Sequence, residues 1–342
     1  MKKVFLMIIS MILSCVFVVF AGCGSAETLD VFTNAFDKNN TATIGYTETH
    51  TYSVNYSDSY KYEDYDYSAD SSIKDTIGID FKNGVFKTAL KIIKVSDFVE
   101  NTESDILSSI PNEQKSSLYL FKFETTLNID AVYTVNGNSE TYSDYVYSLC
   151  YFLPINNQLA PLYSKTENKN TILSIADTTY ITKNHFVNIV SYNKNTLTID
   201  KYTYDYADTS LQTPLTHTNN DGKSYEYDYN TLIDNASLLF AIRNVNIETG
   251  TDITVPVLTP AYEKAVKLNI AYSNDSTETD VNGNSYSVKL ISFVNGESNS
   301  SGKKQLAFID KDNATLIKMV TPLSEYSIHF KGIGALIYTL SE

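Results

Sequence analysis

Tryptophan is absent from this sequence, and arginine occurs once, at Arg243. Basic residues are few overall, because 26 Lys and Arg stand against 40 Asp and Glu and give a net charge of −14. A nucleic-acid-binding protein needs a basic surface that displaces counterions from phosphates, so this composition argues against that class. Tryptophan is the largest aromatic platform, and its absence also disfavours sugar binding by aromatic stacking.

Cysteine is scarce as well. Cys15 lies in an apolar N-terminal run, Cys23 follows that run, and Cys150 is the third. A single thiol in the body cannot form an internal disulfide, so we expect the fold to depend on its hydrophobic core, for which 342 residues suffice. Cys150 lies in a strand-like run, residues 147–152, where a small buried hydrophobe is a better interpretation than a reactive nucleophile.

The N-terminus has the pattern of a secretory signal. Two lysines precede an uncharged apolar run, residues 4–21, and small residues lead into Cys23. The segment resembles a bacterial lipoprotein signal with its lipobox, although Phe20 stands where leucine is usual. The resemblance implies removal of residues 1–22, diacylation of the Cys23 thiol and anchoring on the outer face of the cytoplasmic membrane. The alternative is an uncleaved membrane helix, because the run is nearly long enough to span a bilayer.

Removal of the signal changes the charge of the body. Residues 1–22 contain two lysines, so their loss brings the net charge from −14 to −16. An acidic body is repelled by anionic headgroups. We therefore expect the membrane to be contacted through the lipid at Cys23 alone.

Most of the body alternates apolar or tyrosine residues with polar ones, a period of two that is typical of β-strands. The clearest example is 119–135, in which every odd position is apolar or aromatic except Thr125. These residues exceed the usual strand length, which favours a bent strand of a strongly curved sheet. The other predicted strands are 44–62, 73–81, 85–95, 141–152, 159–166, 186–192, 197–206, 251–257, 266–272, 286–294, 306–309, 316–320 and 328–340.

Turns and helices complete the prediction. Asn- and Gly-containing turns are predicted at 83–84, 136–138, 193–195 and 282–283. Three short helices are predicted: one after Ser25, one near 102–110 capped by Thr102, and one over 235–245 capped by Asp234. The last has one apolar stripe, which must lie on the sheet, and carries Arg243 in its last turn, where a cation suits the helix dipole.

These elements predict a mainly β (α+β) fold. We expect a curved antiparallel sheet, or open half-barrel, with a few short helices packed on one face. Residues 23–342 are predicted to form one extracytoplasmic domain, with a possible subdivision near 101–116, because no linker or internal repeat interrupts them.

No catalytic or metal-binding motif is present in the sequence. The four histidines have no ligand spacing, and HExxH, CxxC, GxSxG and phosphate-binding glycine motifs are absent. Residues 310–313 begin like a calcium loop but lack its glycine and closing glutamate, so a plain turn is favoured. We therefore predict no enzyme, no metal and no cofactor. A hydrolase would need a histidine beside a carboxylate, and the order of the chain offers no such pair.

An acidic run rich in tyrosine, residues 62–70, is the most unusual local feature. It admits two interpretations. One is an adhesive or cation-binding surface loop. The other, which we favour, is a solvated loop between strands.

From about Leu118 onward, short segments of the chain carry a resemblance to one protein family. They are Leu-Ala-Pro-Leu at 159–162 and the segments 234–243, 250–257, 267–272, 282–283, 308–310, 316–320 and 332–337. The order of these features is similar to a bacterial envelope family of unknown function, which is thought to share the half-barrel fold of the LolA-like lipoprotein carriers. The resemblance implies a concave, partly open sheet whose apolar face can shelter an acyl chain.

Two functional hypotheses follow. The first is a non-enzymatic, lipid-anchored envelope protein that binds a hydrophobic ligand or a lipidated client in the half-barrel. Its cavity wall would be made by the inward residues Tyr119, Phe121, Phe123, Leu127 and Tyr133, for each of which core packing is the other interpretation. The second is a structural or interaction protein that has no small-molecule ligand and displays its surface to another envelope protein.

Overall fold

A computed structural model of the chain describes residues 44–57, 77–100, 102–115, 118–155, 158–175, 179–194, 196–219, 232–259, 264–295, 304–323 and 334–342. The predicted signal, Cys23, the helix after Ser25 and the acidic run at 62–70 lie outside these residues. In the ranges that are described, no helix is long and apolar enough to cross a membrane.

The described strands form one sheet of fifteen, in the order β8-β7-β6-β5-β4-β3-β2-β1-β15-β14-β13-β12-β11-β10-β9. Neighbouring strands are antiparallel except β9 and β10, and β8 and β9 form the two edges, so the sheet is not closed. The strands are β1 (Thr47–Ser57), β2 (Ile77–Lys94), β3 (Tyr119–Val135), β4 (Asn138–Ile155), β5 (Gln158–Ile175), β6 (Thr179–Tyr192), β7 (Leu197–Thr203), β8 (Thr216–Asn219), β9 (Ile233–Asp234), β10 (Asp252–Thr259), β11 (Lys264–Thr279), β12 (Ser285–Asn295), β13 (Gln305–Asp310), β14 (Leu316–Pro322) and β15 (Ala335–Leu340). The prediction of a mainly β, curved and open antiparallel sheet is confirmed.

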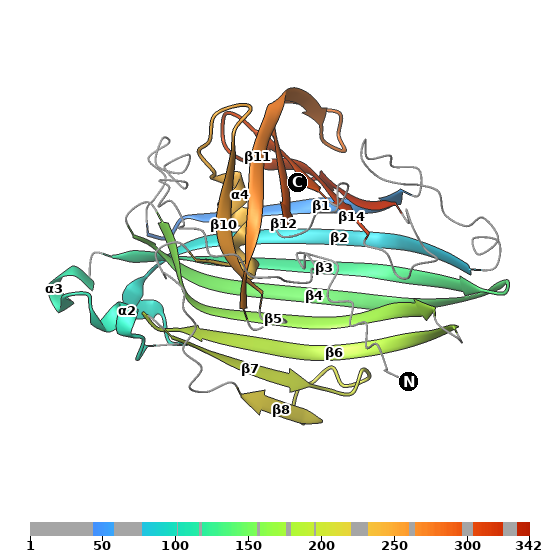
Figure 1. Ribbon diagram of the computed structural model, residues 1–342, viewed down its shortest axis with the longest axis horizontal. Helices are drawn as coiled ribbons and strands as arrows, with labels where there is room; N and C mark the ends of the chain where they lie inside the picture. The colour runs from blue at the N-terminus through green and yellow to red at the C-terminus, as the bar shows by residue number, and fades with distance from the viewer. Residues whose placement is uncertain are drawn as a thin grey trace.

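The sheet curves strongly. Strands β2 to β7 run side by side across Figure 1, and β10 and β11 cross them steeply. The edge strand β9 contacts β5, so the curvature brings one edge of the sheet back against a strand far from it in the strand order. Strand β3 follows the predicted 119–135 residue for residue, whereas β5, β6 and β11 extend well beyond their predicted ends.

The helix inside the curve begins as predicted. A 3₁₀ turn, η2 (Asn235–Ser237), leads into α4 (Leu238–Arg243), and the carboxylate of Asp234 accepts a hydrogen bond from the Ala236 N–H at 2.6 Å. However, every residue of α4 is buried, not only one stripe. The sheet surrounds the helix, and the five residues of α4 before Arg243 are all apolar, as is typical of an enclosed helix.

Helices lie on both faces of the sheet. Successive side chains of a strand point to opposite faces, and on β3 Phe121 belongs to the main core cluster with α4 while Leu120 belongs to a second cluster. That second cluster contains Ile106 and Leu107 of α2 (Asp105–Ser108). The two short elements near it are η1 (Val95–Asp97) and α3 (Asn112–Lys115). We expected the helices to pack on one face of the sheet. Helix α4 packs on the inner face, whereas α2 packs on the opposite face.

The cap of α2 also differs from the prediction. The sequence indicates Thr102, but the Ser104 hydroxyl accepts from the Ile106 N–H at 3.3 Å. The same hydroxyl donates to the Tyr192 carbonyl at 2.8 Å. Ser104 thus joins the helix to the end of β6, a contact that local sequence cannot reveal.

The predicted hairpin turn at Asn83-Gly84 is wrong. Strand β2 runs uninterrupted from Ile77 to Lys94, and the pair forms a β-bulge against β3. Asn83 takes a left-handed φ of 55°, and a Cβ on Gly84 would lie 2.5 Å from the Val54 carbonyl oxygen. The dipeptide suits both structures, because a turn and this bulge each need a residue that tolerates positive φ and a glycine. The turns predicted at 136–138 and 282–283 do connect β3 to β4 and β11 to β12. Residue 195 of the turn predicted at 193–195 lies outside the described residues, and between β6 and β7 the Asn193 N–H donates to the Thr196 carbonyl at 2.8 Å.

Candidate binding pocket beside diverging strands

The predicted cavity wall lies inside the curve and packs against α4. Phe121 and Phe123 place their rings 5.4 and 5.9 Å from the ring of Phe240, and both are buried. Leu127 is buried in the same cluster, and Tyr119 is partly buried against it. Tyr133 donates its hydroxyl proton to the Thr171 carbonyl at 2.8 Å. The structure therefore brings the five residues together on one face, where α4 covers the aromatic end of β3.

A polar pocket forms where β4 and β5 separate. The ladder between these strands ends at the Tyr145–Lys169 pair, although β4 continues against β3 and β5 continues against β6. Beyond that point, the carboxylate of Asp144 accepts the Thr171 N–H, with distances of 3.0 and 3.1 Å to its two oxygens. The Thr171 hydroxyl also donates to Asp144, at 3.0 Å. A side chain thus replaces the strand-to-strand hydrogen bonds.

The pocket beside this point has a volume of about 580 Å³. Its wall comes from four neighbouring strands, the β2 bulge and the segment after β7. The lining residues are Asn83, Asn128, Ile129, Asp130, Ser143, Asp144, Tyr145, Glu167, Lys169, His185, Thr209 and Leu211. None of the five predicted wall residues is among them.

The β2 bulge contributes directly to the pocket. The side-chain amide of Asn83 donates to Asp130 Oδ2 at 2.8 Å, and the Ser143 hydroxyl donates to Asp130 Oδ1 at 2.9 Å. Both oxygens of Asp130 are therefore oriented by neutral donors. Sequence analysis missed Asn83 as a site residue because it interpreted the dipeptide as a turn.

A histidine and a carboxylate meet in the pocket. His185 Nε2 lies 3.2 Å from Glu167 Oε1, and Nδ1 lies 3.2 Å from the Asp205 carbonyl oxygen. Sequence analysis found no such pair, because the contact depends on register. Lys169 pairs directly with His185 in the β5–β6 ladder, and Glu167 is its diagonal neighbour on the same face.

Asp144 differs from the other acids in the wall. Burial raises its pKa, the hydrogen bonds from Thr171 lower it and the charge of Asp130 raises it again, and the balance is about 7. Its side chain is only 6% exposed. Near neutral pH this carboxyl group is therefore partly protonated, whereas an ordinary aspartate is fully ionised.

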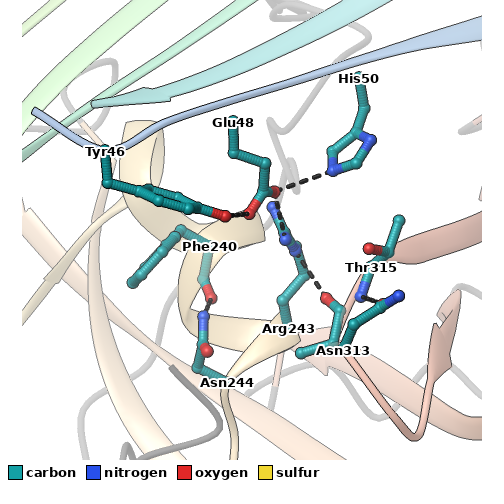
Figure 2. A network of polar contacts seen from close by, with 9 residues as sticks. Tyr46, Glu48, His50, Phe240, Arg243, Asn244, Asn313 and Thr315 are labelled. Atoms are coloured by element: carbon teal, nitrogen blue, oxygen red, sulfur yellow. Dashed lines mark hydrogen bonds and ion pairs between the residues drawn. The ribbon is translucent and has the colours of Figure 1, made fainter. Parts of the chain in front are cut away.

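A second, partly buried polar cluster holds the end of α4 (Figure 2). Arg243 Nη2 lies 2.5 Å from Glu48 Oε1, and its Nε donates to the Ala314 carbonyl at 2.8 Å. His50 lies 2.9 Å from the same glutamate oxygen, and Tyr46 donates to the other at 3.2 Å. Burial alone would raise the pKa of Glu48, but the hydrogen bond from His50 and the charge of Arg243 lower it to about 2. Arg243 therefore does more than complement a helix dipole, since it ties α4 to β1 and to the β13–β14 turn.

Other predicted features have ordinary roles. Cys150 is fully buried without a disulfide, and burial raises the pKa of its thiol, as expected for a small core residue. Residues 311–313 form a turn between β13 and β14. Across the described part of the chain, no group of three or more His, Cys, Asp or Glu residues is placed to hold a metal ion. A further pocket of about 330 Å³ lies along β10 and β11.

Comparisons with known proteins place few limits on function. No protein-family model and no curated protein matches the sequence. Among solved structures, the chain is similar to a crystal structure described as a beta-barrel-like protein of a domain of unknown function from Brucella abortus. The TM-score is 0.39 at 7% identity, over 88% of this chain and 98% of that one. No functional argument rests on a likeness of this size.

Proposed function

We propose that this protein is a lipid-anchored binding protein of the cell envelope, which holds a small ligand without transforming it. The signal pattern that ends at Cys23 supports an anchor on the outer face of the cytoplasmic membrane. The observation that carries the binding function is the pocket of about 580 Å³ beside β4 and β5, which is within the usual range for small-molecule sites.

The position of the pocket favours a polar ligand over an acyl chain. An apolar ligand along Phe121 and Phe123 would have to displace Phe240, whose ring already contacts both. The pocket is open without such a movement, and eight of its twelve lining residues carry a carboxylate, amide or hydroxyl group. In this proposal the half-barrel positions the strands that line the pocket. Its apolar inner face is the alternative binding site, and it is tested separately below.

Binding without catalysis agrees with the contacts of the hydroxyl groups. A histidine–carboxylate pair becomes catalytic when it activates a nucleophile within hydrogen-bond reach. Ser143, the serine of the pocket wall, donates instead to Asp130. Among the residues that the structure describes, no hydroxyl group bonds to the ring of His185.

A ligand screen tests the binding function. The full-length protein in detergent would be heated with a collection of small polar and apolar metabolites, and stabilised samples would be analysed by native mass spectrometry. We expect polar compounds to stabilise the wild type and to stabilise His185→Gln less. His217→Gln is the matched control, because His217 also contacts a carboxylate, Asp200 at 2.8 Å, but lies at the exposed sheet edge.

Three other results have clear meanings. Stabilisation by acyl compounds that Phe240→Ala alters would move the site to the inside of the half-barrel. Equal stabilisation of the His185→Gln and His217→Gln variants would move it elsewhere. If no compound is bound, the interaction protein without a small-molecule ligand becomes the better hypothesis.

The anchor has a separate test. Cys23→Ala should leave the unlipidated protein free of the membrane fraction if the lipid is its only tether. Retention in the membrane pellet would indicate an uncleaved N-terminal helix instead. Mass spectrometry of the mature N-terminus would show the diacylated thiol directly.

A further inference from the structure

We propose that the pocket beside β4 and β5 takes a small organic cation, whose ammonium group lies against the carboxyl group of Asp144. The inference rests on the proposed function, since it names the class of ligand for the same pocket. It is carried by the shape and charge of the wall.

The wall contains more acid than base. Asp130, Asp144 and Glu167 line the pocket with Lys169 and His185. His185 is engaged by Glu167, and Lys169 Nζ lies 4.9 Å from the centre of the Tyr206 ring. In the described ranges, no lysine, arginine or histidine forms an ion pair with Asp130 or Asp144. Three acidic side chains therefore line the pocket with two basic ones.

Asp144 is the acid that a ligand cation would compensate best. It is buried, it lines the pocket, and its hydrogen bonds come from the neutral groups of Thr171. The charge of Asp130 on β3 raises the pKa of Asp144 and that of Lys169 on β5 lowers it, while Asp144 itself acts on Tyr133 of β3 and on Tyr206, after β7. Lys183 of β6 is a second cation nearby, because its Nζ lies 4.8 Å from the ring centre of Tyr142 and 5.9 Å from that of Tyr206. Neither lysine forms an ion pair with Asp144 in the described ranges.

The proton balance follows from this placement. Burial raises the pKa of Asp144 to about 7, so near neutral pH the empty pocket holds this group partly as the neutral acid. An opposite charge nearby favours the ionised form. A ligand that arrives as R–NH₃⁺ therefore forms an ion pair with the carboxylate, and the proton of Asp144 leaves to the buffer. No covalent bond of the ligand changes.

The rest of the wall suits an amine on a short carbon chain. Ile129 and Leu211 supply apolar surface, and the ring of Tyr145 can face a cation. A bare metal ion is a poorer match, because no described cluster of three or more carboxylate, histidine or cysteine ligands exists. The geometry favours an ammonium group with a few methylenes attached.

Calorimetry with a matched pair of probes tests this class of ligand. The full-length protein in detergent would be titrated with 1,4-diaminobutane and with the isosteric neutral 1,4-butanediol, at pH 7 in phosphate and in Tris. We expect the diamine to bind and the diol not to bind. The measured enthalpy should differ between the buffers, because they take up the released proton with different enthalpies.

Variants assign the effect to one group. Asp144→Asn should abolish the buffer dependence and weaken diamine binding about tenfold, the loss that corresponds to ~1.4 kcal/mol. Wild-type affinity should fall between pH 8 and pH 5.5, while Asp144→Asn should show a flatter profile. Asp312→Asn, on the exposed β13–β14 turn, is the control carboxylate and should behave like the wild type.

The possible failures are distinguishable. Equal binding of diol and diamine, or diamine binding without proton release, overturns the cation proposal but leaves the pocket a binding site. If neither probe binds while the metabolite screen finds another ligand for the pocket, the class of ligand is wrong. If the screen also finds no ligand, the proposed function fails with it.

Discussion

Glu48 on β1 is a partly buried carboxylate, 15% exposed, and Asp144 on β4 is a buried one, 6% exposed, and their surroundings act on them in opposite ways. Glu48 contacts Arg243 and His50, and its pKa falls to about 2 despite burial. Asp144 receives only neutral hydrogen bonds from Thr171, and burial raises its pKa to about 7. Burial raises the pKa of both groups, and the direct contacts of Glu48 with Arg243 and His50 outweigh that effect, whereas the contacts of Asp144 do not.

The two groups give opposite dependences of stability on pH. The pKa of Glu48 is lower in the folded state than in the unfolded chain, so its stabilisation is complete above about pH 4.5 and is lost as the pH falls toward 2. The pKa of Asp144 is higher in the folded state, so its contribution is greatest below about pH 4 and is lost as the pH rises to 7. Glu48 therefore contributes most to the free energy of unfolding near neutral pH, and Asp144 contributes most in acid.

Removal of the cation from the Glu48 region should have the largest effect. Arg243→Met leaves the partly buried Glu48 without its charged partner, and the cost of losing one member of a fully buried pair, about 3–5 kcal/mol of unfolding free energy, is the upper limit of the expected loss. Urea unfolding at pH 7 measures this loss. Lys318→Met is the control: its ion pair with Glu278 is partly exposed, so we expect about 1 kcal/mol or less. The double variant Glu48→Gln/Arg243→Met should recover part of the loss, and its failure to do so would contradict the ion-pair explanation.

The bulge at Gly84 links the two regions, because it contacts β1 and its neighbour Asn83 bonds to Asp130. Gly84→Ala would place a Cβ 2.5 Å from the Val54 carbonyl oxygen, so the backbone must shift. We expect a loss of about 1–3 kcal/mol in urea unfolding. Gly78→Ala on the same strand is the control, since its nearest neighbour would be Thr134 Cβ at 3.4 Å. Equal losses in the two variants would show that strand propensity, not the close approach, is responsible.

Neutralisation of Asp144 should stabilise the protein at pH 8 and remove the pH dependence that this group contributes to stability. At pH 8 Asp144→Asn avoids a buried charge without a counter-charge, and we expect a gain on the order of 1–2 kcal/mol. Near pH 4 the wild-type group is already protonated, so the gain should vanish. Thermal unfolding from pH 4 to pH 8 measures this convergence, with Asp312→Asn as the exposed control. A gain that is the same at every pH would contradict a titration of Asp144.

Removal of the histidine beside Glu48 should have the smallest effect. His50→Gln takes away one of the contacts that lower the pKa of Glu48 and should cost about 0.5–1.5 kcal/mol. The acid unfolding midpoint should move to higher pH, while His217→Gln at the exposed edge should leave it unchanged. An unchanged midpoint in His50→Gln would assign the low pKa of Glu48 to Arg243 alone.

Features that depend on neighbours in the sequence were predictable. The alternation along 119–135 indicated β3 with its ends and its inward face, and Asp234 indicated the start of the helix that became η2 and α4. Asn83-Gly84 misled because its local preference suits a hairpin and a bulge equally. Only the pairing of β2 with β1 on one side and β3 on the other determines which forms.

The candidate pocket was not predictable for the same reason. Glu167 and His185 face each other through the register of β5 and β6. Asp144 carries no local signal, because its role arises where the β4–β5 ladder stops. A signal existed in the polar residues of long predicted strands, but without register they could not be assigned to a shared site.

By itself, the sequence determined the class of this protein: strand periodicity specifies a curved β-sheet, and the charged and apolar order of the first residues predicts an anchor at Cys23. These are local properties, which neighbouring side chains impose on the backbone. The tertiary structure alone decided that Arg243 meets Glu48, 195 residues away, and that Asp144 forms no ion pair within the described residues. Charge in a buried site depends on which distant groups the sheet brings together, because a low-dielectric interior makes the nearest partner dominant.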